Sequence, residues 1–206
     1  MSVTLKPFGK ILEADSIWRG FVLYNRETGI KRERTLRDHY SAIEPIQLVS
    51  AVPNSIQEHF DTARNLLVYA WFVYSFLPVA QMHAFSSVEY AIRVKSGKKL
   101  MLKQGLELAI KEHWITDKGF HYYKIKQQGP EGNLPYARNS DSEDVQAYCK
   151  ILSDAFPYIR NELAHGNPMT YPGGLVELSL CADLINQLFD PSPSRFETSG
   201  QGTSHH

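Results

Sequence analysis

The feature of the sequence that most restricts its fold is a long uncharged stretch in the first half of the chain. No charged residue lies between Arg64 and Glu89, and residues 66–80 are almost wholly apolar. A helix that spans a membrane needs about 20 apolar residues, whereas this run is shorter and polar side chains follow it. Its aromatic residues suit the centre of a helical core: Tyr69, Trp71, Phe72, Tyr74 and Phe76. We therefore expect a buried helix of a globular protein and no membrane association.

The composition supports this expectation. The chain has 206 residues, 43% of them hydrophobic and 21% charged, as in an ordinary globular protein of one domain with an appendage. Its 22 basic and 22 acidic residues argue against a nucleic-acid binder held by bulk charge, although a local basic face stays open. Only Cys149 and Cys181 are present, so a disulfide scaffold is excluded and both are expected in the core. Residues 1–10 show no secretory signal, and we expect a cytoplasmic protein.

The spacing of apolar residues predicts an all-α fold of about five helices within residues 54–190. Ser55 with Glu58, and Ser140 with Glu143, are capping-box pairs that mark helix starts. The first helix is expected to run to about residue 77, where Pro78 ends or kinks it. The other expected helices cover residues 79–95, 100–114, 140–157 and 175–189, with Ser96-Gly97 as a stop signal.

The remaining segments are expected to lie outside the helical domain. Residues 1–53 are an N-terminal arm or cap, in which residues 17–22 suggest one face of a short helix. The basic run at residues 31–37 predicts a solvated helix face that leads to Tyr40 and Ile43. Residues 116–139 form a long connection, and residues 191–206 are expected to be a disordered tail.

The segment with the most distinctive chemistry is RNELAHG at residues 160–166. If Pro157 lies in the first turn of a short helix, Asn161 and His165 share a face and Gly166 ends the helix. Arg160 supplies a permanent positive charge, Asn161 an amide, and His165 a group that titrates near neutral pH. These are the side chains that phosphate chemistry needs, and the same side chains also serve simply to cap or solvate a helix end.

This segment resembles the motif of the HEPN superfamily, in which an arginine followed by a polar residue precedes a histidine. Four residues separate Arg160 from His165, and Asn161 is the polar residue. The resemblance covers residues 54–190 and leaves out residues 1–53. It implies a HEPN-like helical bundle that forms a homodimer. Many members are metal-independent endoribonucleases of toxin–antitoxin or defence systems, with RNA and an antitoxin or another protein as partners.

By this resemblance, Arg160 and His165 are the catalytic pair and Asn161 supports them. His165 deprotonates the ribose 2′-hydroxyl or protonates the leaving oxygen, while Arg160 neutralises charge on the scissile phosphate. The expected products carry a 2′,3′-cyclic phosphate and a 5′-hydroxyl, and no cofactor or metal is needed. Because the reaction needs both a general base and a general acid and the motif supplies one histidine per chain, we expect two copies to form a composite site.

A basic stretch outside the motif is a second candidate for contact with RNA. Residues 93–126 hold nine basic residues (Lys or Arg) and three acidic residues (Asp or Glu). Residues 131–206 hold four basic and ten acidic residues. Aromatic side chains alternate with lysines in the basic stretch, a mixture that suits single-stranded RNA. The expected RNA-binding residues are Lys118, Tyr122, Lys124 and Lys126; the alternative is a solvated face with aromatic anchors.

Two functions stay open at the level of the sequence. The complete set of Arg160, Asn161 and His165 favours the ribonuclease. The neutral net charge and the acidic surroundings of the motif favour a non-catalytic HEPN-like dimer that binds RNA, a nucleotide or a protein. A metal site is not expected, because no two histidines show the HxH or HxxxH spacing.

Overall fold

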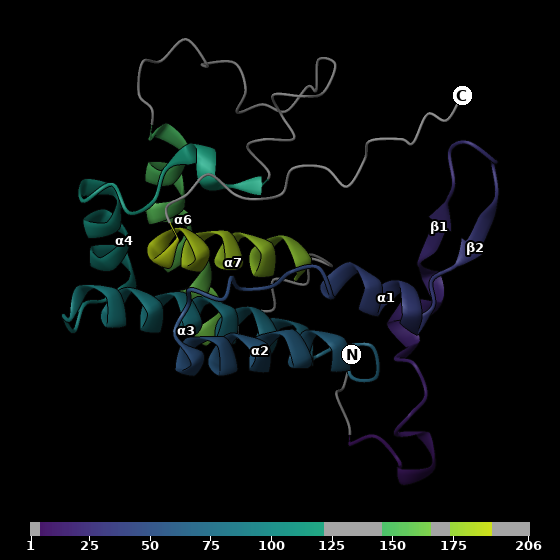
Figure 1. Cartoon of the computed structure of the whole chain (residues 1–206). Coiled ribbons are helices and arrows are strands. Elements are labelled where there is room, and N and C mark those ends of the chain that lie inside the picture. Colours follow the sequence, from purple (N-terminus) through teal and green to yellow (C-terminus); the bar gives the residue numbers. More distant parts are fainter. Residues whose placement is uncertain (1–4, 122–145, 166–173, 191–206) are drawn as a thin grey trace, which may run out of the picture.

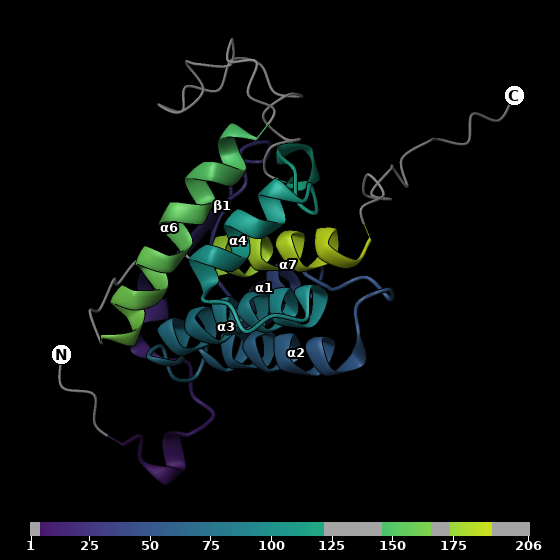
Figure 2. The same cartoon turned by 90° about the vertical axis from the view of Figure 1, so that its left-hand side faces the viewer.

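The computed structural model describes residues 5–121, 146–165 and 174–190, and its fold is all-α, as predicted (Figure 1). The helices of the bundle are α2 (Asn54–Tyr69), α3 (Phe76–Ser96), α4 (Leu102–Lys111), α6 (Ala147–Ala164) and α7 (Leu175–Phe189). Helix α3 is central, since it packs against α2, α4, α6 and α7. Figure 2 shows α6 crossing the bundle beside α4 and α3.

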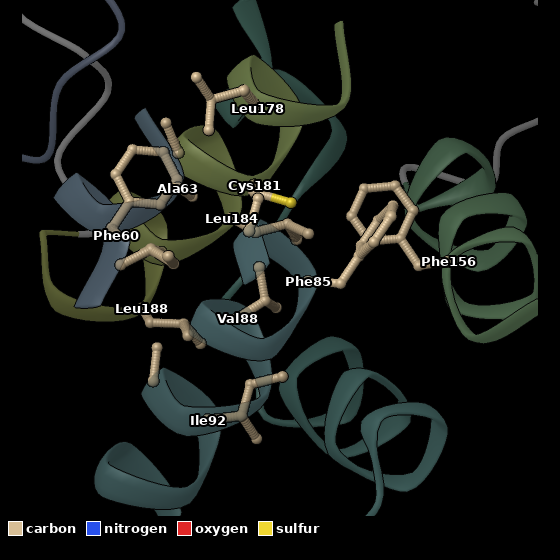
Figure 3. Packing of buried hydrophobic residues seen from close by; sticks show 14 of the residues in the cluster. Phe60, Ala63, Phe85, Val88, Ile92, Phe156, Leu178, Cys181, Leu184 and Leu188 are labelled. Atoms are coloured by element: carbon tan, nitrogen blue, oxygen red, sulfur yellow. The ribbon is translucent and has the colours of Figure 1, made fainter. Parts of the chain in front are cut away.

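The core is built from the inward faces of these helices. Figure 3 shows Phe85 of α3 and Phe156 of α6 pointing toward one another. Their ring centroids are 4.9 Å apart at an interplanar angle of 76°, the edge-to-face arrangement that aromatic pairs favour. Helix α7 fills the other side of α3 with Leu178, Cys181, Leu184 and Leu188. All these side chains are buried.

The uncharged stretch is not one helix, and the prediction that a helix runs to residue 77 is wrong. Helix α2 ends at Tyr69 and α3 begins at Phe76, with a turn between them. Pro78 lies in the first turn of α3, where the missing N–H of proline costs no helical hydrogen bond. The predicted stop at Ser96-Gly97 is confirmed, because Gly97 follows α3 with a φ of 66°.

Helix α6 corrects a second expectation about proline. It is continuous over 18 residues with Pro157 in its interior, so no separate short helix holds the RNELAHG motif. Its first turn is capped by a residue from elsewhere: the carboxylate of Asp117 accepts hydrogen bonds from the N–H groups of Tyr148 (3.0 Å) and Cys149 (2.9 Å). The Ser140–Glu143 pair lies outside the described residues.

The N-terminal segment contains a hairpin that the sequence did not predict. Strands β1 (Val22–Tyr24) and β2 (Lys31–Glu33) pair antiparallel, and α1 (Leu36–Ile43) follows. The expected helix face over residues 31–37 is therefore wrong for residues 31–35 and confirmed for residues 36 and 37, because the helix starts only after Thr35, whose side chain caps it. The expected short helix over residues 17–22 is a 3₁₀ turn, Ser16–Gly20, that leads into β1.

This segment packs on the turn between α2 and α3. The indole N–H of Trp18 donates to the carbonyl of Ala70 (3.1 Å), and its ring stacks on Trp71 at 5.7 Å. The carboxylate of Asp15 accepts from the backbone N–H of Tyr74 (3.0 Å). Of the five aromatic residues expected in a helical core, only Trp71 is buried, and Tyr69 and Phe76 are 56% and 37% exposed, so that expectation is wrong.

Other predictions about the chain have mixed outcomes. Cys149 and Cys181 are buried and unbridged, as predicted, and burial raises the pKa of both thiols. Within the described ranges, no helix is both long enough and apolar enough to cross a membrane. The predicted tail at residues 191–206 lies outside the described residues.

The aromatic contact between α3 and α6 gives the first testable prediction. Phe156→Ala should lower the free energy of unfolding by about 3–5 kcal/mol, because it leaves a cavity against Phe85. Tyr158→Ala is the matched control on the same helix; its side chain is 63% exposed, and its cost should stay within about 1 kcal/mol. Denaturant titration of both variants measures the difference. Equal losses would show that the contact does not hold α6 in place.

Candidate active site

The register between α3 and α6 places Arg160 above Glu89. Each residue lies four positions after the phenylalanine that its helix contributes to the core, so each shares a face with that ring. The guanidinium Nη2 of Arg160 is 3.8 Å from Oε2 of Glu89. The other carboxylate oxygen of Glu89 bonds Arg93, one turn further along α3. One largely buried carboxylate therefore faces two guanidinium groups.

These residues line an open cleft of about 430 Å³ between three helices. Its walls are His59 from α2, Ser86, Glu89, Tyr90 and Arg93 from α3, and Arg160 from α6. Two arginines against one carboxylate leave an excess of positive charge even when the imidazole is neutral. The cleft is therefore suited to bind an anion.

Within the described residues, the guanidinium of Arg160 is only partly satisfied. Its Nη1 donates to the side-chain oxygen of Asn161 (3.2 Å), and its contact with Glu89 is longer than a normal hydrogen bond. Its Nε is buried and has no hydrogen-bond partner among the described residues. The side chain is 31% exposed. A guanidinium that is held in place by neighbouring side chains, but whose hydrogen-bond donors are only partly used, is able to bind two oxygens of one oxyanion.

The structure brings together Arg160 and Asn161 of the motif, whereas His165 stands apart. His165 is the C-terminal cap of α6, and its backbone N–H donates to the carbonyl of Asn161 (2.9 Å). Its side chain is exposed, and no contact among the described residues joins it to Arg160. Five positions on a helix correspond to about 140° of rotation, so the two side chains leave α6 in different directions.

The predicted RNA-binding residues do not line this cleft where they are described. Lys118 is exposed in the 3₁₀ turn that caps the first turn of α6. Arg160 lies twelve residues after Tyr148, which corresponds to about 18 Å of helix. Tyr122, Lys124 and Lys126 lie outside the described residues.

His59 is a cleft residue that the sequence did not single out. Its ring stacks on that of His83, with centroids 4.2 Å apart and planes 10° from parallel. Its Nδ1 lies 2.8 Å from the hydroxyl of Ser87. Partial burial, and then the neighbouring His83, lower the pKa of the His59 imidazole.

Glu89 and Arg93 were also missed, although the sequence carries a weak signal for them. They are the first charged residues after the uncharged stretch, and their spacing of four is that of an ion pair along a helix. His59 has no such local signal, because its place in the cleft depends on how α2 packs on α3.

Comparison with protein-family models, curated proteins and solved structures finds no match to this chain. In the part of the chain that the structure describes, no group of three or more His, Cys, Asp and Glu side chains is placed to hold a metal ion.

The charge balance of the cleft gives the second prediction. Glu89→Gln should raise the affinity for inorganic phosphate by roughly tenfold at low salt, because Glu89 is the only carboxylate among the described residues that line the cleft. Asp154→Asn is the control, since it removes a carboxylate that pairs with Lys103 elsewhere on α6 and should leave the affinity unchanged. Calorimetric titration measures both. The same phosphate affinity in the wild type and both variants would contradict an anion site in this cleft.

Proposed function

We propose that this protein is a metal-independent endoribonuclease, HEPN-like in its motif, whose catalytic centre is the cleft between α2, α3 and α6. One observation carries the proposal: Arg160, the arginine of the motif, lines the same polar cleft as a second arginine, Arg93, and an imidazole, His59. An RNA phosphodiester needs such a set, because its cleavage requires charge stabilisation at phosphorus and proton transfer at two oxygens.

The two arginines stabilise the charge that builds up during cleavage. Attack of the 2′-oxygen adds negative charge to the phosphoryl oxygens, and the partly exposed guanidinium of Arg160 lines the cleft and donates to them. Glu89, whose side chain is 13% exposed, holds the guanidinium groups of Arg93 and Arg160 before the substrate arrives. Such fixed donors need little reorganisation when the charge appears, and each contributes roughly 10²–10³-fold to the rate.

His165 enters the proposal through a second copy of the chain. Because His165 and Arg160 leave α6 about 140° apart, the two side chains of one copy do not meet in one cleft. The proposal therefore requires a two-fold dimer whose interface includes the cleft, so that His165 of one copy reaches the cleft of the other and protonates the leaving oxygen.

A second candidate function is binding without cleavage. It is favoured by Glu89, which faces both arginines and neutralises part of their charge as in a structural ion-pair network. In this case the same dimer would hold RNA, a nucleotide or an acidic protein segment in the cleft. Arg160→Ala would then weaken binding of a single-stranded RNA that the wild type binds and leaves intact.

The ribonuclease proposal predicts cleavage of single-stranded RNA in EDTA. Arg160→Ala should lower kcat/KM by roughly 10²–10³-fold and His165→Ala by roughly 10²–10⁴-fold. The products should carry 2′,3′-cyclic phosphate and 5′-hydroxyl ends. Arg64→Ala is the control, because Arg64 pairs with Asp61 on α2 and does not line the cleft.

Cleavage that survives in both active-site variants would come from a contaminant or from another site. An absence of cleavage with several RNAs, by a folded wild-type protein, would favour the binding function instead.

The composite site makes a separate prediction for mixed dimers. Arg160→Ala and His165→Ala chains, each inactive alone, should regain about one quarter of the wild-type rate when mixed equally and allowed to exchange subunits. Half of the dimers would then be mixed, and each would hold one intact site. Unmixed proteins at the same total concentration are the control. Mixtures that stay inactive although exchange is shown by labelled subunits would place both residues in one chain's site.

A further inference from the structure

We propose that His59 is the general base of the cleft and that Ser87 is the residue that positions it. This inference rests on the proposed ribonuclease function. It supplies the second imidazole that a single motif histidine leaves missing, since one group must take a proton from the 2′-hydroxyl while another gives a proton to the leaving oxygen.

The hydrogen bonds around Ser87 assign a tautomer to His59. The Ser87 hydroxyl lies 2.9 Å from the backbone carbonyl of His83 and 2.8 Å from Nδ1 of His59. We assign its one hydrogen to the carbonyl, so the hydroxyl accepts from Nδ1 and Nδ1 carries the hydrogen. In the neutral ring the lone pair is then on Nε2. Ser87 is fully buried, so this arrangement is held by the packing of α2 on α3.

Nε2 of His59 is free to act in the cleft. It forms no hydrogen bond with any described residue, and it is not among the polar atoms that are buried without a partner. Stacking on His83 fixes the plane of the ring, and the bond to Ser87 fixes its rotation. A base with a defined tautomer and a fixed ring is what proton abstraction requires.

The surroundings keep the imidazole neutral. Burial disfavours the charged ring, and His83 adds to the effect, so the pKa of His59 lies below its ordinary value. A lowered pKa leaves the base unprotonated at neutral pH, and its function is lost only as the pH falls below that pKa. The titratable and charged groups around it are His83, Glu89, Tyr90 and Arg93 of α3 and Arg160 of α6.

His59 starts the cleavage step. Nε2 takes the proton of the 2′-hydroxyl, and the 2′-oxygen forms a bond to phosphorus. The bond from phosphorus to the 5′-oxygen breaks, and that oxygen takes a proton from the imidazolium of His165. The products are a 2′,3′-cyclic phosphate and a 5′-hydroxyl, with His59 protonated and His165 neutral until solvent restores both.

The direct test replaces the base but keeps its hydrogen bond. His59→Asn retains an N–H donor close to the position of Nδ1 and removes Nε2. We expect kcat for RNA cleavage to fall roughly 10²–10⁴-fold with little change in KM. Imidazole added to a His59→Ala variant should restore part of the rate, which a purely structural role would not allow. Wild-type rates in His59→Asn would overturn the inference and leave the ribonuclease proposal standing.

The positioning role of Ser87 has its own matched pair. Ser87→Ala should lower kcat roughly tenfold, because the ring is then free to rotate and to change tautomer. Ser153→Ala removes another buried helical hydroxyl, one that bonds the carbonyl of Lys150, and should leave kcat unchanged. His83→Phe keeps a flat ring against His59 but removes its charge, so the acid limb of the pH–rate profile should move to higher pH.

A readout that does not depend on cleavage completes the design. ¹⁵N NMR of the wild-type imidazoles should show His59 protonated at Nδ1 at neutral pH, and Ser87→Ala should mix the tautomers. The Nε2–H tautomer in the wild type would overturn the geometry of the proposal, whatever the cleavage result. A wild type that shows the Nδ1–H tautomer and binds phosphate in the cleft but cuts no RNA would instead overturn the ribonuclease function, and the role of His59 as its base with it.

Discussion

The edge-to-face contact between Phe85 and Phe156 is the interaction on which the candidate site depends. It fixes how α6 lies on the central helix, and one turn further along both helices the same register brings Arg160 to Glu89. A rotation of α6 by one residue, about 100°, would turn Arg160 away from the cleft. The geometry of the site is therefore a consequence of core packing, and the tight packing of protein interiors makes that geometry rigid.

Helix α3 carries both the core and the chemistry. Its buried face holds Phe85, Val88 and Ile92, whereas Glu89 and Arg93 lie on the side that the cleft leaves open. Ser86 and Ser87 differ in the same way, since the first lines the cleft and the second is buried. The Ser87 hydroxyl contacts Nδ1 of His59 on α2 at 2.8 Å, and His59 lines the cleft from that helix. Charges held by a packed helix keep their positions when a substrate binds.

The sequence predicted those parts of the structure that depend on local signals. Helix α7 follows from apolar periodicity, and the end of α3 follows from Gly97. The helix boundaries predicted from the two prolines were wrong. Pro78 does not end a helix, because it lies in the first turn of α3, where proline is tolerated. Pro157 does not begin a helix, because α6 continues through it and its packing offsets the hydrogen bond that the proline lacks. The motif identified Arg160 alone among the residues that line the cleft. The others come from α2 and α3 and meet Arg160 only through tertiary packing, which no spacing in the sequence records.

The most direct test of the account is a crystal structure of the protein with a short single-stranded RNA whose scissile 2′-hydroxyl is replaced by hydrogen, so that it binds without being cut. We predict that one phosphate contacts the guanidinium groups of Arg160 and Arg93, and that the 2′-carbon lies next to Nε2 of His59. An oligonucleotide bound on another face of the molecule, with the cleft empty at saturating ligand, would contradict it.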